Sequence, residues 1–218
     1  MQFSKKETRL IKEQFDAWLN QRGDDISLSE VFDAKTALTK ELFFKHVLVH
    51  KCMYSSIFKA TSTEVQPELE RRLAEATETF SSSHVCKLSG EKIAERMVVA
   101  FEQKLRPSSA KKLAGTIMDI ARWLDQFEKD AALILTINRY TSSPLTRNRL
   151  PLVLCTRIRG LSFQNACLML ANIGFHDFGS VNKSTLQRLH ELGLIPTESP
   201  TAQLPIIALE TIQAIRLW

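Results

Sequence analysis

Apolar side chains recur at helical spacing along almost the whole chain, and this periodicity limits the fold more than any other feature of the sequence. Between Ser4 and Asn20, for example, Leu10, Phe15 and Trp18 lie on one stripe of a helix. No segment alternates apolar and polar residues as strongly as a half-buried strand does. The sequence therefore predicts an all-α fold, organised as a two-lobed helical bundle.

Capping residues, glycines and prolines divide this pattern into separate helices. We expect helices over residues 4–20, 39–59, 68–80, 90–105, 110–127, 151–157, 162–171, 182–191 and 201–217. Ser89 and either Ser108 or Ser109 precede two of these helices and are predicted to be their N-caps. Residues 140–150 are predicted to form a loop, and Trp123 is predicted to lie in the core.

The size of the chain bounds its organisation. With 218 residues, 44% of them hydrophobic, it can bury one sizeable core. We expect a single domain over residues 1–218 with two lobes, about 1–140 and 141–218, and a last helix that packs back onto the first lobe. The longest apolar runs, Ala131–Ile137 and Pro151–Cys155, are far shorter than the roughly 20 residues of a membrane span. No apolar segment follows the charged N-terminus, so we predict a cytoplasmic protein without a membrane partner.

Residues that could bind a metal are scattered along the sequence. His46 and His50 share one face of a predicted helix, but without a third ligand nearby they are more simply packed or surface side chains. No motif of a hydrolase or of a nucleotide-binding loop is present. The four cysteines, Cys52, Cys86, Cys155 and Cys167, form no CxxC or CxH pair. We therefore predict that they are reduced thiols, and we expect neither a bound metal nor a cofactor.

The segment "RGLSFQNACLMLANIG", from Arg159 to Gly174, places a glycine turn directly before a helix of small and apolar residues. Together with the preceding helix it matches a helical hairpin pattern in which Ser162 replaces a second glycine. Unpaired N–H groups and the positive end of the helix dipole favour an anion at such a turn. Gly160, Leu161 and Ser162 are therefore a candidate site for a DNA phosphate, contacted without regard to base sequence. The alternative is a structural turn, in which Gly160 merely ends a helix.

The distribution of charge supports the phosphate interpretation. A net charge of +5 and a pI near 9.1 are too modest to indicate nucleic-acid binding by themselves. However, no acidic residue occurs between Asp130 and Asp177. Four arginines precede or enter the turn and are candidate phosphate ligands: Arg147, Arg149, Arg157 and Arg159.

The segment 154–195 resembles the helix-hairpin-helix DNA glycosylase superfamily, and most closely its small archaeal-type oxoguanine glycosylase branch. The resemblance rests on the hairpin quoted above and on the loop-helix "DFGSVNKSTL" that follows it. It implies a glycosylase-like fold and DNA as the partner. It also implies recognition of a damaged, modified or extruded base.

The same resemblance implies where the catalytic groups of the family would lie. Gln164 stands at the position of the family's lysine nucleophile, and Asn182 at the position of its aspartate. An amide cannot form the Schiff base that a lysine amine forms with the sugar, and a neutral Asn offers the sugar cation only a weak dipole. We therefore expect DNA binding with reduced or lost cleavage of the N-glycosidic bond.

Alternatives to this interpretation stay open. Lys183 beside Asn182, or Asp177, could supply relocated catalytic groups in an active base-excision glycosylase. The two neutral residues could also be deliberate replacements, and the chain could instead be a helical protein-interaction module. In the family branch the C-terminal residue folds toward the base pocket. The resemblance therefore implies that Trp218 could stack on an extruded base, although it could equally close the last helix against the core.

Overall fold

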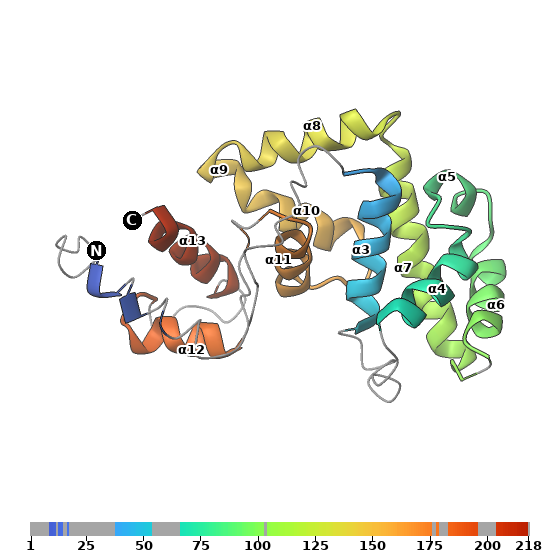
Figure 1. Ribbon diagram of the computed structural model, residues 1–218, viewed down its shortest axis with the longest axis horizontal. Coiled ribbons are helices and arrows are strands. Elements are labelled where there is room, and N and C mark those ends of the chain that lie inside the picture. Colours follow the sequence, from blue (N-terminus) through green and yellow to red (C-terminus); the bar gives the residue numbers. More distant parts are fainter. Residues whose placement is uncertain are drawn as a thin grey trace. The chain divides into compact units, whose positions relative to one another are not determined.

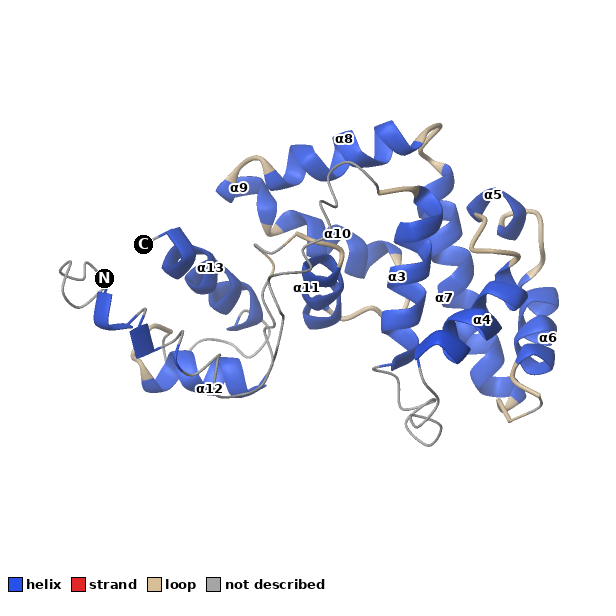
Figure 2. Ribbon diagram, in the orientation of Figure 1, coloured by secondary structure: helices blue, strands red, loops and turns tan. Residues whose placement is uncertain are grey.

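The computed structural model of the chain describes residues 9–11, 13, 14, 17, 38–53, 66–102, 104–175, 178, 183–195 and 204–217. Within these ranges it forms 11 helices and no strand (Figure 2). The predicted all-α class is therefore confirmed for the part of the chain that is described.

The helices carry the labels of Figure 1. They are α3 (Lys40–Met53), α4 (Gln66–Thr77), α5 (Ser82–Val85), α6 (Gly90–Ala100), α7 (Pro107–Asp125), α8 (Asp130–Thr141), α9 (Pro144–Arg147), α10 (Arg149–Arg157), α11 (Phe163–Asn172), α12 (Lys183–Glu191) and α13 (Leu204–Leu217).

The chain divides into two compact units. One unit is Lys35–Met169 and contains α3 to α10 with most of α11. The other combines Met1–Ala34 with Leu170–Trp218, and within it α12 and α13 pack against each other. The expected lobes of about 1–140 and 141–218, with the last helix packed onto the first lobe, stay a prediction.

Helix α7 lies at the centre of the unit Lys35–Met169, where it contacts α3, α5, α6 and α10 (Figure 1). The helix has 19 residues, and most of those from its second turn onward are buried, because other helices cover it on several sides. Trp123 is 6% exposed, and its ring centroid lies 5.2 Å from that of Phe43 and 5.1 Å from that of Phe127. The predicted core position of Trp123 is therefore confirmed, and α7 is the helix against which the other segments are positioned.

One of the two predicted N-caps is confirmed and the other is wrong. The hydroxyl of Ser89 accepts a hydrogen bond from the N–H of Lys92 at 3.2 Å and caps α6. Helix α7 begins earlier than expected, at Pro107, with Arg106 as an N-cap that makes no side-chain hydrogen bond. Proline is favoured at the first position of a helix because its fixed φ suits the helix and its missing N–H would have no partner there. Ser108 and Ser109 consequently lie inside the first turn.

The predicted loop over residues 140–150 is mostly wrong. Helix α8 continues to Thr141, α9 forms a short turn from Pro144, and α10 begins at Arg149. The Nε and Nη2 atoms of Arg147 donate to the carbonyl of Thr141 at 3.3 and 3.1 Å and so complete the end of α8. Serine, threonine and proline in this segment mark the breaks between helices rather than a long irregular connection.

Several predicted helices differ from the observed ones only at their ends. Helix α3 covers the first part of the expected helix 39–59, and residues 54–59 lie outside the described ranges. Helix α6 stops at Ala100 instead of continuing to residue 105, and Glu102 has a left-handed φ of 51°. Of the expected helix 4–20, the described residues 9–11, 13, 14 and 17 are helical.

All four cysteines carry free thiols. Burial raises the pKa of the Cys155 thiol to about 11 and raises the pKa values of Cys52 and Cys167 as well, so these thiols are protonated at neutral pH. In the described ranges, no three His, Cys, Asp or Glu residues are grouped so that they could hold a metal ion. None of the described helices is both long enough and apolar enough to cross a bilayer.

Candidate nucleic-acid interface

The turn between α10 and α11 contains the glycine that the sequence pattern predicts. The N–H of Ile158 donates to the carbonyl of Leu154 at 2.9 Å, and the N–H of Leu161 donates to the carbonyl of Ile158 at 3.2 Å, which closes a β-turn. Gly160 occupies the third position of this turn with a φ of +70°. An L-residue pays about 1–2 kcal/mol for this left-handed conformation, so the turn depends on glycine.

Ser162 caps the start of α11. Its hydroxyl accepts a hydrogen bond from the N–H of Asn165 at 3.2 Å, and its carbonyl accepts one from the N–H of Ala166 at 2.9 Å. A serine therefore has a structural purpose where the family pattern has glycine, because a cap satisfies one of the amides of the first turn. The amides of Ser162 and Phe163 have no acceptor among the described residues. They lie at the positive end of the dipole of α11.

Arg159, one of the four predicted phosphate ligands, is paired with Asp119 of α7. The carboxylate of Asp119 accepts hydrogen bonds from the backbone N–H of Arg159 at 3.1 Å, from its Nε at 2.7 Å and from its Nη2 at 3.0 Å. Burial acts to raise the pKa of Asp119, but the hydrogen bonds from Arg159 outweigh it and the pKa is lowered. Asp119 therefore occupies N–H donors of Arg159 that the sequence analysis assigned to a phosphate. The same hydrogen bonds hold the turn against α7.

Two further side chains hold the turn through its carbonyls. The hydroxyl of Thr116 donates to the carbonyl of Arg159 at 3.0 Å, and the ammonium of Lys51 on α3 donates to the carbonyl of Gly160. A Cβ atom at Gly160 would lie 3.0 Å from the Nζ of Lys51. The turn is therefore fixed by side chains from α3 and α7 and not only by its own hydrogen bonds.

Sequence reasoning missed Lys51, Thr116 and Asp119. They contact the turn from 109, 43 and 40 positions away in the chain, and no local pattern links such distant residues. One signal was available in Gly115, a glycine inside the amphipathic helix α7. A Cβ atom there would lie 3.2 Å from the Nη1 of Arg159, so glycine allows the guanidinium to lie directly over the helix.

The structure separates the four predicted arginines. The guanidinium of Arg147 donates hydrogen bonds to the carbonyl of Thr141 at the end of α8. Arg149 and Arg157 are exposed and pair with no acidic residue in the described part of the chain. They begin and end α10, so their backbones are roughly 12 Å apart along the helix axis. Of the four, Arg157 and Arg159 are the ones that lie at the turn.

The predicted catalytic positions are described only in part. Gln164 lies in the first turn of α11 with a half-buried side chain. Lys183 is the first residue of α12 and is exposed. Asp177, Asn182 and Trp218 lie outside the described residues. The meeting of these groups in one pocket therefore stays a prediction.

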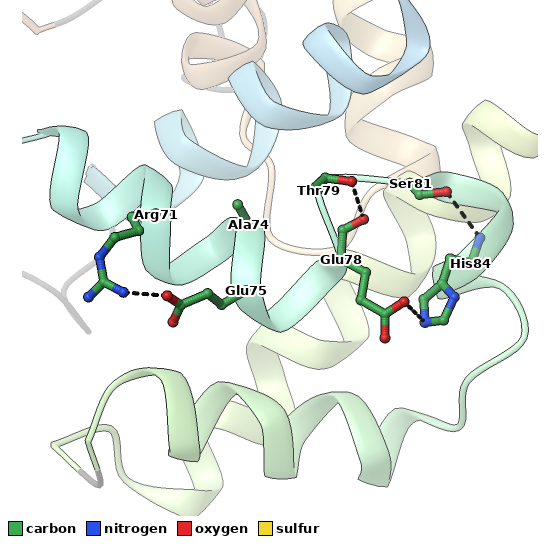
Figure 3. A pocket seen from close by; sticks show the side chains of 7 residues that line it. All are labelled: Arg71, Ala74, Glu75, Glu78, Thr79, Ser81 and His84. Atoms are coloured by element: carbon green, nitrogen blue, oxygen red, sulfur yellow. Dashed lines mark hydrogen bonds and ion pairs between the residues drawn. The ribbon is translucent and has the colours of Figure 1, made fainter.

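A second region has the residue types of a catalytic site but not its geometry. It is a shallow surface hollow at the connection of α4 and α5, lined by Arg71, Ala74, Glu75, Glu78, Thr79, Ser81 and His84 (Figure 3). The carboxylate of Glu78 lies 2.9 Å from Nε2 of His84 and 2.6 Å from Nη1 of Arg96. The hydroxyl of Ser81 accepts from the backbone N–H of His84 at 3.4 Å, as an N-cap does. Because this hydroxyl caps a helix and the imidazole faces Glu78, the arrangement does not activate a nucleophile.

Comparison of the chain with known protein families, with curated proteins and with solved structures finds no match.

Proposed function

We propose that this protein binds DNA through the turn between α10 and α11, in the manner of a helix-hairpin-helix DNA glycosylase with reduced or lost bond cleavage. One observation carries the proposal. The glycine turn has the left-handed backbone that the hairpin pattern requires, and it leads directly into the start of α11. The amides of Ser162 and Phe163 at this helix start are suited to a phosphate oxygen.

The charges around the turn favour an anion. Lys51 reaches the carbonyl of Gly160, and Arg157 and Arg159 shortly precede the glycine in the sequence. Asp119 is the acid in contact with the turn, and Arg159 neutralises it. A phosphate would meet these cations without having to displace a helix cap.

The proposal extends to an altered base by the family resemblance. By that resemblance, Trp218 is the residue on which an extruded base would stack. Gln164 and Asn182 replace the two charged catalytic residues, so binding without efficient cleavage is the expected outcome. In the second version of this proposal, Lys183 or Asp177 supplies the missing charge and the protein is an active glycosylase.

A second candidate function is a helical protein-interaction module. It is favoured by one observation: Asp119 already accepts the backbone N–H and the guanidinium of Arg159. A turn whose arginine is already paired with an acid of the fold can serve as a purely structural corner. Duplex DNA binding separates the two candidates, because an interaction module has no need of a phosphate.

The experiment is a salt titration of binding to a short fluorescent DNA duplex, with Gly160→Asp as the test variant. The new carboxylate would start beside Nζ of Lys51 and would add a negative charge next to the proposed phosphate site. Loss of one charge-assisted hydrogen bond, about 1.5–3 kcal/mol, corresponds to a rise of roughly 10- to 150-fold in Kd. Gly193→Asp is the matched control, because Gly193 also has a left-handed φ of +66° and its Cβ would meet no atom within 4 Å.

The proposal predicts tight binding by the wild type, weakened binding by Gly160→Asp and near wild-type binding by Gly193→Asp. Thermal melting of both variants shows that each is folded. If folded Gly160→Asp binds the duplex as tightly as the wild type does, the turn is structural. The interaction-module candidate then replaces the proposal.

The chemistry is tested by borohydride trapping on a duplex with an abasic site, which captures a Schiff base between an amine and the sugar. The wild type should give no adduct, because Gln164 has no amine. The double variant Gln164→Lys with Asn182→Asp should give a trapped adduct if a glycosylase pocket is present. An adduct or strand cleavage with the wild type would instead support the active-enzyme version, and Lys183 and Asp177 would be the residues to change.

A further inference from the structure

Two exposed lysines lie beside the turn on the first half of α7. Lys111 and Lys112 pair with no acidic residue in the described ranges. Lys111 lies one helical turn before Gly115, the residue over which the guanidinium of Arg159 lies at 3.2 Å from the Cβ position. Four residues of helix correspond to about 6 Å along the axis. Lys111 is therefore a close neighbour of Arg159 in space, although 48 positions separate them in the numbering of the chain.

Lys112 has a similar place relative to the turn. The hydroxyl of Thr116 lies 3.5 Å from the carbonyl of Lys112 and donates to the carbonyl of Arg159 at 3.0 Å. The backbone of α7 at Lys112 is thus joined through one side chain to the backbone of the turn. The backbone of α7 at Lys111 and Lys112 therefore lies on the part of the helix that approaches the turn.

These residues form one basic surface on the unit Lys35–Met169. We define it by Lys51, Lys111, Lys112, Arg157 and Arg159, with Asp119 as the acid that contacts it. The surface joins cations from α3, α7 and the end of α10, which are separate in the sequence and are brought together by packing around α7 (Figure 1).

We infer that DNA contact extends from the turn along the first half of α7, where Lys111 and Lys112 bind phosphates next to the one held at the turn. The inference rests on the proposed function. A duplex backbone presents phosphates in series, so a row of cations on a rigid helix can neutralise several of them. Lysine suits this use because its ammonium is a mobile point charge that contacts phosphate without reading bases.

Lys51 differs from the two lysines of α7 in this surface, because its side chain is hydrogen-bonded to the turn. Its ammonium has three N–H donors, and the carbonyl of Gly160 accepts from one of them. No acceptor among the described residues takes the other two donors, so they are available to an anion at the turn. Lys51 therefore fixes the turn and adds positive charge to it.

The test measures the salt dependence of duplex binding for the double variant Lys111→Ala with Lys112→Ala. Each lost phosphate contact should reduce the slope of log K against log salt by about 0.9, so the double variant should lose up to about 1.8. Lys87→Ala with Lys92→Ala is the matched control. It removes the same charge from two exposed lysines at α5 and α6, which lie across α7 from α10 (Figure 1).

The result that supports the inference is a reduced slope for the α7 variant and a nearly unchanged slope for the control. Equal slopes for the two variants, or an unchanged slope for the α7 variant, overturn it. If the wild type binds and Gly160→Asp weakens binding while the α7 variant does not differ from its control, the proposed function stands and the inference is wrong. If the wild type does not bind DNA, both are wrong. Melting curves show that the variants are folded, which is expected because the altered side chains are exposed.

Discussion

Among the turns with left-handed backbone in the unit Lys35–Met169, two are built from very different residues. The turn between α10 and α11 uses Gly160, with a φ of +70°. The turn between α4 and α5 uses three successive residues other than glycine, Glu78, Thr79 and Phe80, with φ values of 48°, 61° and 62°. Lys51 and Arg159 lie at the first turn, whereas the second carries Glu78, which pairs with His84 (Figure 3) and also with Arg96.

The difference shows what each turn is for. Phe80 is 7% exposed, and its ring packs edge-on against Phe44 with centroids 6.2 Å apart. Burial of this ring offsets a backbone strain of about 1–2 kcal/mol per residue, so the α4–α5 turn is held by the core. At Gly160 the strain is avoided by omitting the side chain, which leaves the backbone accessible. Left-handed backbone alone therefore does not mark a binding site, but a glycine turn among cations is consistent with one.

The largest expected effect tests whether burial of Phe80 holds the α4–α5 turn. Phe80→Ala should lower the free energy of unfolding by about 3–5 kcal/mol, because it removes a buried ring and leaves a cavity beside Phe44. Urea denaturation measures this change, and Val99→Ala is the control because Val99 is 75% exposed. DNA binding by the folded fraction should not change. A loss below about 1 kcal/mol would mean that Phe80 does not hold the α4–α5 turn.

The next largest effect is a loss of stability at acidic pH. It arises from His50 on α3, the helix whose Lys51 contacts the glycine turn. Burial, with a smaller contribution from His46, lowers the pKa of His50 from 6.5 to about 4. Between these values the unfolded chain binds a proton that the folded protein does not, so stability is complete above pH 6.5 and falls as the pH drops toward 4. The slope should reach about 1.4 kcal/mol per pH unit. Urea titrations across this range measure it.

His50→Gln is the matched variant for the acid prediction, and it should flatten the slope. Glu68 contributes in a lower range, because hydrogen bonds from Arg71 and then Arg72 lower its pKa from 4.5 to about 2. Its contribution is lost only as the pH falls below about 4.5. Burial also lowers the pKa of His46, so a smaller slope should remain in this range. A slope between pH 6.5 and 4.5 that is as steep in His50→Gln as in the wild type would contradict the assignment to His50.

The smallest effects come from exchanging the residue types of the two turns. Gly160→Ala should lower stability by about 1–2 kcal/mol, since alanine must adopt a left-handed φ and its Cβ would lie 3.0 Å from Nζ of Lys51. Thr79→Gly should raise stability by up to about 1 kcal/mol, because relief of strain exceeds the added entropy of the unfolded chain. Thermal melting measures both changes. Changes of the same sign in both variants would show that the two turns do not differ as described.

Local features were predictable from the sequence, and their errors have local causes. The helix α11, its preceding glycine turn and the cap at Ser89 were all expected, because they depend on residues within about four positions of one another. The cap of α7 was misassigned because Pro107 competed with two nearby serines. The loop expected at residues 140–150 was wrong because short helical turns share its composition.

The candidate site was predictable only in its backbone. The sequence indicated the left-handed glycine and the basic character of its neighbours, but it could not show that Asp119 pairs with Arg159 or that Arg147 is used at the end of α8. An arginine in a sequence has no visible partner, since the acid that binds it can lie on any helix packed nearby. The number of arginines in this segment therefore says less about a phosphate site than the partners that each arginine has in the folded protein.

The sequence by itself determined that the chain is helical, where most helices lie and where the backbone must turn on a glycine. Helical hydrogen bonds, caps and left-handed turns involve neighbours in the chain, so residue types specify them directly. Only the tertiary structure decided what holds that turn and which charges surround it. Lys51, Thr116 and Asp119 reach it from positions 40 to 109 residues away, because α3, α7 and α10 pack around a shared core. The helix crossings that bring them together follow from how side-chain rows interlock, which no local pattern records.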